Sequence, residues 1–437
     1  MQARLRQRIQ LRFWNLNPVV EKFAPLILGA VLALTTFQKW QLILHTDGGG
    51  DLLGADLPKS MMLIAGQDPY SSNPWASPYP PFLLAFVGGV IRVTSGMTVL
   101  SPDTVGIISR NVRTVGLLAD ACVAIVIFLV LRARGFSGFF SLVPAIVFVT
   151  LPSISLSPYY WFNSDVFGYP ILAVSVLLLV LNRYLLGSIL LSLATIFKIH
   201  PLLAVFLVLF WLVRKHGLSR AFPVILATGS ILSAGLVVPV LLPGYLGSVL
   251  GFNLSSGFGR GTSSFTMMNL LYATLPGFLG VSLPLTVENQ AWLAVTALLF
   301  VIALGVVWAR GRLMDPVDVV AIGLLVWIIP LRQIYTHYLV WAVVPFLMRG
   351  RFSQTLLVGS LLELANTMAS WSWDLPPDPF PVLATPGGFL ATSVVYLSVS
   401  ATALFFCLRR PIVSTLHAEF EQIARPAEAR LVHEILV

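Results

Sequence analysis

Residues 45–81 read HTDGGGDLLGADLPKSMMLIAGQDPYSSNPWASPYPP, the longest polar interval between apolar segments in the first half of the chain. Four carboxylates stand here among glycines and prolines: Asp47, Asp51, Asp56 and Asp68. Glycines let a backbone turn tightly and approach a bulky ligand, and a carboxylate can take a proton from a hydroxyl group. The pattern predicts a site loop, although an N-cap or a solvated loop acid also accounts for any one of these residues.

The rest of the chain is strongly apolar: 57% of its 437 residues are hydrophobic and only 10% are charged, unlike an ordinary soluble domain. The composition predicts a polytopic membrane protein. The net charge of +9 does not indicate nucleic-acid binding, because lysines and arginines fall in short clusters between apolar runs, as the positive-inside rule predicts. Cys122 and Cys407 both lie in apolar runs and give no sign of a disulfide or a metal site.

The basic N-terminus precedes a long apolar run, which we interpret as a retained first helix rather than a cleaved signal. Its charges place the N-terminus in the cytoplasm and the loop 45–80 outside. The short segment 81–93 is predicted to be a juxtamembrane or re-entrant helix on the outer face, because a crossing there would deliver Arg132 and Arg134 to the outside.

We therefore expect an all-α polytopic membrane protein with about twelve transmembrane helices and juxtamembrane helices in the first outer loop. Residues 1–410 form one transmembrane domain, with the first outer loop at 45–113. Residues 411–437 form a cytoplasmic amphipathic tail, so that both termini are cytoplasmic. The predicted spans are 24–44, 114–131, 137–152, 168–182, 186–198, 201–213, 221–242, 290–309, 317–331, 338–348, 354–370 and 387–407.

Polar residues that topology does not explain collect on the outer face. In FKIHPLL, Lys198 and His200 precede Pro201, and an ammonium group there can pair with a lipid phosphate; snorkelling of the lysine is the alternative. In RQIYTHYLVW, His337 is either a hydrogen-bonded core residue or a partner for phosphate or a sugar hydroxyl. The other candidates for ligand binding in that segment are Arg332, Gln333 and Tyr335.

Three arginines fall outside in this topology, which favours an anionic ligand, though each could bind lipid headgroups instead. They are Arg110, Arg113 and Arg260. Tyr70, Trp75 and Tyr79 could stack on sugar faces or belong to the interfacial aromatic belt.

Asp120 lies within a predicted span, where an acid is costly and faces the bundle interior. We favour pairing with Arg113 or a helix-packing hydrogen bond over a proton relay, and interpret Glu363 and Asn366 in the same way. The sequence contains no ATP-binding loop, HExxH pair or GxSxG elbow. The energy for any reaction must therefore come with the substrate.

Four segments, in this order, resemble the GT-C superfamily of polytopic glycosyltransferases, which use polyprenyl-phosphate sugars. They are AGQDPYSSNPWASPYPPFLLAF (65–86), VGLLADACVAIVIFLVLRARG (115–135), LATIFKIHPLL (193–203) and YTHYLVWAVVPFLM (335–348). They are most similar to the branch that holds the first mannosyltransferase of GPI-anchor assembly and its prokaryotic relatives. Together they are spread along the chain from about 45 to 348 in the expected order, and each motif alone is loose.

The resemblance implies that Asp51, fifteen residues before Gly66, is the catalytic base, with Asp47 or Asp56 as second choices. The aromatic residue that follows the family's acid is replaced here by Leu52, Leu53 and Gly54, which leaves the identity of the acid open. Lys198 matches the family's lysine before its proline, and His337 stands where the branch carries a polar residue; both are implied to contact the donor.

The implied reaction moves a sugar, mannose in this branch, from a polyprenyl-phosphate donor to a hydroxyl of a lipid-linked or glycan acceptor. Asp51 takes the hydroxyl proton, and Lys198 with Arg260 or Arg332 stabilises the departing phosphate. We expect no metal and no cofactor; the partners are the donor, the acceptor and membrane lipids.

Two other classes of function remain open. An ion-coupled transporter or lipid flippase would depend on the buried acids Asp120 and Glu363. An O-antigen-type polymerase or ligase would be expected to have a large arginine-rich outer loop, whereas Arg260 is the single arginine in the loop 243–289.

Overall fold

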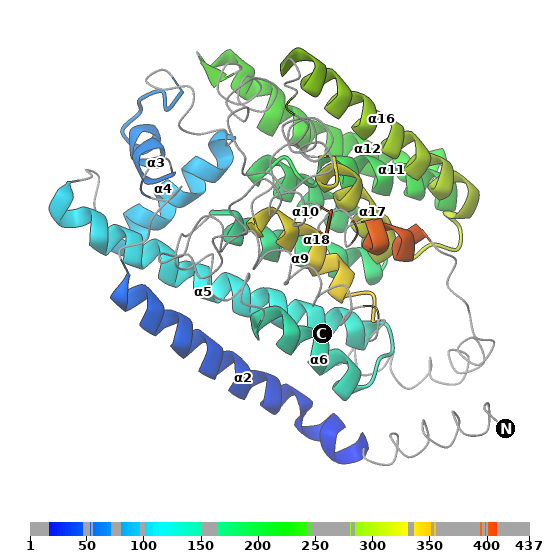
Figure 1. Ribbon diagram of the computed structural model, residues 1–437, viewed down its shortest axis with the longest axis horizontal. Helices are drawn as coiled ribbons and strands as arrows, with labels where there is room; N and C mark the ends of the chain where they lie inside the picture. The colour runs from blue at the N-terminus through cyan, green and yellow to red at the C-terminus, as the bar shows by residue number, and fades with distance from the viewer. Residues whose placement is uncertain are drawn as a thin grey trace.

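The computed structural model describes residues 17–46, 53, 56–70, 80–96, 101–150, 164–242, 244–245, 280, 285–330, 336–350, 354, 394–395, 398 and 401–408. These residues form helices and turns, and none of them belongs to a β-strand (Figure 1). The α-helices are α2 (Asn17–His45), α3 (Leu57–Ile64), α4 (Pro81–Ser95), α5 (Pro102–Ala133), α6 (Gly138–Thr150), α9 (Gly168–Val180), α10 (Tyr184–Phe197), α11 (Leu202–His216), α12 (Leu218–Leu232), α16 (Leu285–Arg310), α17 (Pro316–Ile328) and α18 (Thr336–Leu347). Three short turns of 3₁₀- or π-helix are η2 (Ser164–Phe167), η3 (Ser233–Val237) and η4 (Val238–Leu241).

Four described helices are long and apolar enough to cross a membrane: Glu21–His45, Asp103–Ala133, Leu218–Leu241 and Leu293–Arg310. Shorter apolar helices include α4, α6, α9, α10 and α17. Each predicted span from 24–44 to 338–348 coincides with a described helix. The total of twelve stays a prediction, because 354–370 and most of 387–407 lie outside the described residues, as does the tail 411–437.

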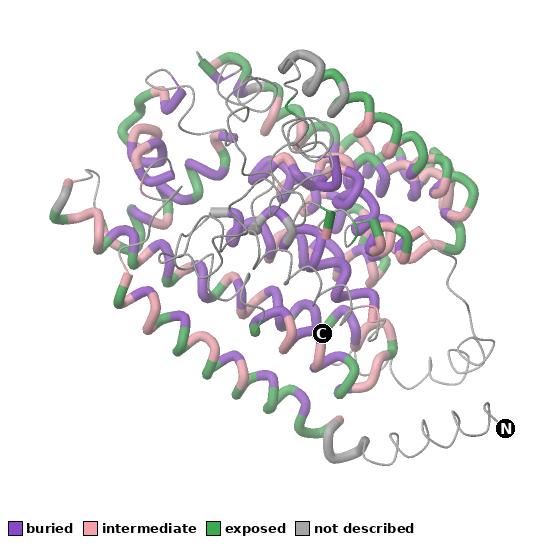
Figure 2. The backbone as a smooth tube through the Cα atoms, viewed as in Figure 1, coloured by how far each residue is buried: buried purple, intermediate pink, exposed green. Residues whose placement is uncertain are grey.

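Helices α9, α10 and α17 form the interior of the bundle, and other helices surround them. Helix α9 packs against α10, α5 and α17, and α17 packs against α11 and α18. Figure 2 shows these central helices mostly buried, whereas α2, α12 and α16 expose one side. Gly323 of α17 lies against the backbone of Ala204 in α11, so a side chain at this position would force the two helices apart.

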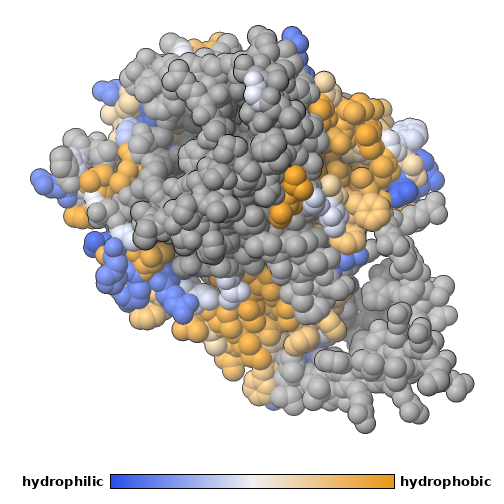
Figure 3. Space-filling model, viewed as in Figure 1, coloured by the Kyte–Doolittle hydropathy of each residue, from blue (hydrophilic) through white to orange (hydrophobic). Residues whose placement is uncertain are grey.

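The outward sides of the peripheral helices are apolar. Leu26 of α2, Leu226 of α12 and Val301 of α16 are each more than 60% exposed. Figure 3 shows apolar surface at the lower middle and the upper right of the view, with hydrophilic residues toward its left and right edges. Large exposed apolar surfaces of this kind need a partner other than water, and together with the long apolar helices they indicate an α-helical membrane protein.

Helices α2 and α5 run antiparallel and are joined by polar side-chain contacts at three positions along their length. Near one end Arg132 pairs with Glu21 at 2.9 Å. In the middle Lys39 pairs with Asp120 at 2.9 Å, with both side chains buried. Near the other end the guanidinium of Arg113 donates to Thr46 Oγ1 at 2.7 Å. Of the two predicted arrangements for Asp120, pairing with Arg113 or a helix-packing hydrogen bond, the structure shows the second, with Lys39 as a donor that the sequence did not suggest.

The arginines that follow the predicted inward-directed spans gather at one end of the bundle, here called the basic end. Arg134 pairs with Asp315 at 2.8 Å, and Arg349 pairs with Asp318 at 2.6 Å. Arg310 also donates to the carbonyl oxygen of Leu408. The charge pattern correctly grouped these connections, whereas the side of the membrane that they face stays a prediction.

The opposite end, here called the loop end, carries α3 and α4, at the left of Figure 1. Helix α4 packs on α3, α5 and α10, and Gly88 of α4 lies against Ile64 of α3. Asn111 of α5 donates to the carbonyl oxygen of Thr94 and joins α4 to the first part of α5. The helix predicted at 81–93 is therefore present as α4, while its placement on the outer face stays a prediction. The connection between α10 and α11 lies at the same end.

Candidate functional site

A buried polar cluster lies where α10 turns into α11. Helix α10 ends at Phe197, and Lys198 adopts an extended conformation (φ −148°, ψ 132°). Pro201 disfavours helical geometry at His200, the residue before it, so the chain breaks here and restarts as α11. Lys198 and His200 are only 5% and 4% exposed. The FKIHPLL segment thus directs two polar side chains into the protein.

The ammonium group of Lys198 pairs with the carboxylate of Asp165. The distance from Nζ to Oδ1 is 2.7 Å, and the two side chains are 7% and 0% exposed. Asp165 lies in η2, immediately before α9. Sequence reasoning missed this residue, which lies in the connection between the predicted spans 137–152 and 168–182. An acid directly before a span that begins at the same end as Lys198 was the available signal.

Aromatic side chains from α18 enclose this pair. The indole nitrogen of Trp341 donates to Asp165 Oδ2 at 3.3 Å, and Lys198 Nζ lies 5.1 Å from the centre of the Tyr338 ring. Tyr169 packs edge-on against Trp341, with ring centroids 5.1 Å apart. A cation near an aromatic face is attracted to it, so α18 helps to hold the ammonium group in place.

His200 presents a defined tautomer. The Trp327 indole nitrogen lies 3.0 Å from His200 Nδ1, and an indole N–H can only donate. Nδ1 is therefore the acceptor, and the proton of the neutral ring is on Nε2, which is buried without a hydrogen-bond partner among the described residues. Burial, and then Lys198, lower the pKa of His200 well below its usual value. The neutral ring thus offers a buried Nε2–H donor.

The cluster combines one ammonium group with one imidazole donor, next to a single carboxylate. An ammonium group has three N–H donors, so Lys198 can bind Asp165 and a second anion together. Such donors in a water-poor site can hold an anionic oxygen, for example that of a phosphate. Within the described residues, no group of three His, Cys, Asp or Glu side chains is placed to hold a metal ion.

Phenylalanines of α4 connect the first loop to this cluster. Phe82 and Phe86 contact Phe197, with ring centroids 5.0 Å and 5.3 Å apart. Phe86 also lies 5.2 Å from Phe167. Phe197 is adjacent to Lys198, and Phe167 lies in the same short helix as Asp165. The structure therefore packs the helix that follows the YPP sequence against phenylalanines that lie next to Lys198 and close to Asp165 in the chain.

The described part of the first loop changes two expectations. Tyr70 is 1% exposed and packs edge-on against Tyr245 at 5.3 Å, so its ring is part of the loop core and does not offer a face to a sugar. Asp56, a second choice for the base, begins the first loop helix with its side chain fully buried. Asp68 accepts a hydrogen bond from Tyr70 N at 2.9 Å, so its carboxylate stabilises the turn around Pro69.

Arg113 of α5 stabilises the packing of this helix against the end of α2. Besides Thr46, its guanidinium donates to the carbonyl oxygen of Ile43 at 3.3 Å, and the side chain is 1% exposed. The basic group thus satisfies carbonyl oxygens at the end of α2, which accounts for its position without a substrate. His337 lies in the first turn of α18 beside Tyr338, at the same end as His200, but its side chain lies outside the described residues. So do Asp47, Asp51, Tyr79, Arg260, Arg332 and Tyr335.

Replacing Gly168 with alanine is expected to displace Trp341. A Cβ atom at this position would overlap the Trp341 ring, and overpacking of this kind costs about 1–3 kcal/mol. We expect a lower melting temperature in detergent and a weaker hydrogen bond from Trp341 to Asp165. Gly89→Ala in α4 is the control, since nothing lies within 4 Å of its Cβ position. Equal stability of the two variants would contradict the packing argument.

The pKa of His200 predicts how stability varies with pH. Its folded pKa lies below the unfolded value of 6.5, so the unfolded state binds more protons as the pH falls through this range. The His200 contribution is complete above pH 6.5 and is lost below it, by at most about 1.4 kcal/mol per pH unit. Melting temperatures of wild type and His200→Gln between about pH 8 and about pH 5 test this. A His200→Gln profile as steep as that of the wild type below pH 6.5 refutes it.

No protein-family model matches the chain, and no curated protein matches it. Function is therefore inferred from the residues and their arrangement.

Proposed function

We propose that the chain is a membrane glycosyltransferase that moves a sugar from a polyprenyl-phosphate donor to a hydroxyl of a lipid-linked or glycan acceptor. The observation that carries the proposal is the buried Lys198–Asp165 pair, held by aromatic residues and connected through α4 to the acidic first loop. A phosphate-binding cation and a loop of carboxylates at one end of an apolar bundle suit a donor that is both anionic and lipid-linked. Mannose as the sugar, and the outer face as the location, come from the family resemblance and the charge pattern.

The reaction is a single displacement at the anomeric carbon. The acceptor oxygen forms a bond to this carbon while the bond to the donor phosphate oxygen breaks, and the electron pair leaves with the phosphate. Asp51 takes the proton from the acceptor hydroxyl. Lys198 stabilises the negative charge on the departing phosphate, with Arg260 or Arg332 as further cations and His337 as a contact to the donor.

Two residues that pack around Lys198 support the proposal. Asp165 positions the ammonium group, with Nζ 2.7 Å from its carboxylate oxygen. His200 lies in the same connection between α10 and α11. Its Nε2–H is the group that can donate to a phosphate oxygen, because Nδ1 accepts the hydrogen bond from Trp327. A neutral imidazole is a suitable donor here, because it binds an anion without adding a second buried charge.

The direct test is incubation of the purified protein with radiolabelled polyprenyl-phosphate mannose and a panel of glycolipid acceptors. The proposal predicts a mannosylated lipid product whose formation requires both substrates. Polyprenyl-phosphate glucose and polyprenyl-phosphate arabinose, offered in parallel, test the sugar separately from the reaction class. A folded protein that transfers none of these sugars to any acceptor contradicts the proposal.

An ion-coupled transporter is the second candidate, and the buried Lys39–Asp120 pair is the observation that favours it. Ionisable pairs inside a membrane bundle are typical of proton relays. Proteoliposomes with an imposed pH gradient distinguish the two classes. Proton flux that Asp120→Asn abolishes, in a protein without transferase activity, would favour the transporter. Glu363, the other acid considered for that function, lies outside the described residues.

A further inference from the structure

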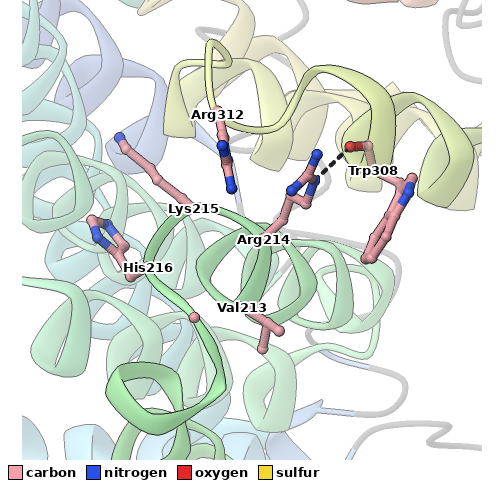
Figure 4. A pocket seen from close by; sticks show the side chains of 7 residues that line it. Val213, Arg214, Lys215, His216, Trp308 and Arg312 are labelled. Atoms are coloured by element: carbon pink, nitrogen blue, oxygen red, sulfur yellow. Dashed lines mark hydrogen bonds between the residues drawn. The ribbon is translucent and has the colours of Figure 1, made fainter.

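A cavity of about 410 Å³ lies at the basic end, between the last turn of α11 and the end of α16. Figure 4 shows Arg312 pointing from the turn after α16 toward the end of α11, between Lys215 and Arg214. The residues that line the cavity are Val213, Arg214, Lys215, His216, Gly217, Trp308 and Arg312. Three of these side chains are permanent cations at neutral pH, and none of the lining residues is acidic.

Two of the cations are fixed by aromatic neighbours. Arg214 Nε donates to the carbonyl oxygen of Trp308 at 2.8 Å, and its guanidinium carbon lies 4.9 Å from the centre of the Trp308 ring. Lys215 Nζ lies 4.6 Å from the centre of the Trp211 ring. Side chains that are already ordered lose less entropy when a ligand binds, so the cavity is prepared for an anion.

The contrast with neighbouring arginines is informative. At the same end, Arg132, Arg134 and Arg349 each pair with a carboxylate. The part of the chain that the structure describes gives no such partner to Lys215 or Arg312. The positive-inside rule explains why cations lie at this end, but it requires neither a cavity nor a group of cations without carboxylates.

The surroundings of the cavity indicate where the anion comes from. Trp308 is 57% exposed, and Val301, farther along α16, is 63% exposed. On the other side, Leu218 and Phe222 of α12 are 62% and 58% exposed. The cavity therefore opens beside the apolar surfaces that face lipid tails, which a soluble phosphate compound would not use.

We propose that this cavity binds the phosphate headgroup of an anionic phospholipid, with its acyl chains along the exposed face of α16. Phosphate accepts hydrogen bonds from guanidinium and ammonium groups, and basic pockets between membrane helices suit such headgroups. Burial, followed by the charges of Lys215 and Arg220, lowers the pKa of His216. This site lies at the opposite end from Lys198 and is independent of the proposed transferase reaction.

Native mass spectrometry of the detergent-solubilised protein with phosphatidylglycerol tests the proposal, with phosphatidylcholine as the zwitterionic comparison. We expect retention of phosphatidylglycerol in preference to phosphatidylcholine. Arg312→Gln should weaken phosphatidylglycerol binding about fivefold, and Lys215→Gln/Arg312→Gln about 25-fold, at about fivefold per cation. Arg183→Gln is the charge-matched control, since Arg183 is exposed in the turn between α9 and α10, and it should bind as the wild type does.

Three results would contradict the proposed lipid site. Equal retention of the two lipids, or equal weakening by Arg183→Gln and Arg312→Gln, would show that the cavity is not a specific site. Displacement of phosphatidylglycerol by glycerol 1-phosphate at equal concentration would overturn the lipid as the source of the phosphate. Melting temperatures of all variants, measured in the same detergent, ensure that only folded proteins are compared.

Discussion

Replacing Lys198 with methionine is expected to reduce sugar transfer by about 10²–10³-fold, because a cation that stabilises charge on a departing phosphate contributes about 2.7–4 kcal/mol to the transition state. The same change leaves the carboxylate of Asp165 buried without this cation. Breaking a buried ion pair from one side costs about 3–5 kcal/mol of stability. A loss of activity in this variant alone therefore does not separate catalysis from folding.

The double variant Lys198→Met/Asp165→Leu separates them. Replacing both buried charges by apolar residues of similar volume is often neutral for stability, so we expect a melting temperature close to that of the wild type. Transfer should stay as low as in Lys198→Met, because the phosphate still lacks its cation. A double variant that is both stable and active would show that the pair serves packing alone. Asp165→Leu alone should lower stability and leave the ammonium group without its positioning contact.

Asp51→Asn is expected to lower transfer by about 10²–10⁴-fold, the contribution of a positioned general base. Asparagine keeps the shape of the side chain but cannot take a proton from the acceptor hydroxyl. The rate of mannosyl transfer at saturating donor concentration is the measurement. Wild-type activity in a folded Asp51→Asn protein would remove Asp51 from the mechanism.

Two neighbouring acids provide matched controls for this change. Asp68→Asn removes the same charge from the same loop, but Asp68 holds the turn at Tyr70, so we expect nearly normal transfer with a small loss of stability. Asp47→Asn tests the second choice for the base. If Asp47→Asn lowers transfer and Asp51→Asn does not, Asp47 is the general base. The proposal that the first loop supplies the base would still hold.

Apolar periodicity and charge were sufficient to predict most of the helices. The positive-inside rule also predicted which connections share an end, because it depends on local clusters such as Arg132 and Arg134. The amphipathic segment LPKSMMLI, by contrast, was read as part of a polar loop. Its eight residues form α3, which is too short to be stable alone and depends on packing against α4.

The candidate site was only partly predictable, because its main contacts are long-range. Lys198 was identified from its position before a proline, but its pairing with Asp165 depends on how α9 and α10 pack. Asp120 was recognised as an acid within a span, whereas nothing in the sequence singled out its partner Lys39. Charge patterns report the side of a membrane, and they do not report which helices are neighbours.

The three polar ties between α2 and α5 have a mechanical consequence. They are spread from Glu21 to Thr46, so axial slip of one helix past the other strains all three at once. The two helices therefore form a rigid pair with a fixed register. Membrane helices accommodate a change in bilayer thickness by tilting, and α2 and α5 must tilt together. Because α4 packs on α5, a thicker or thinner bilayer would also change the inclination of the first loop.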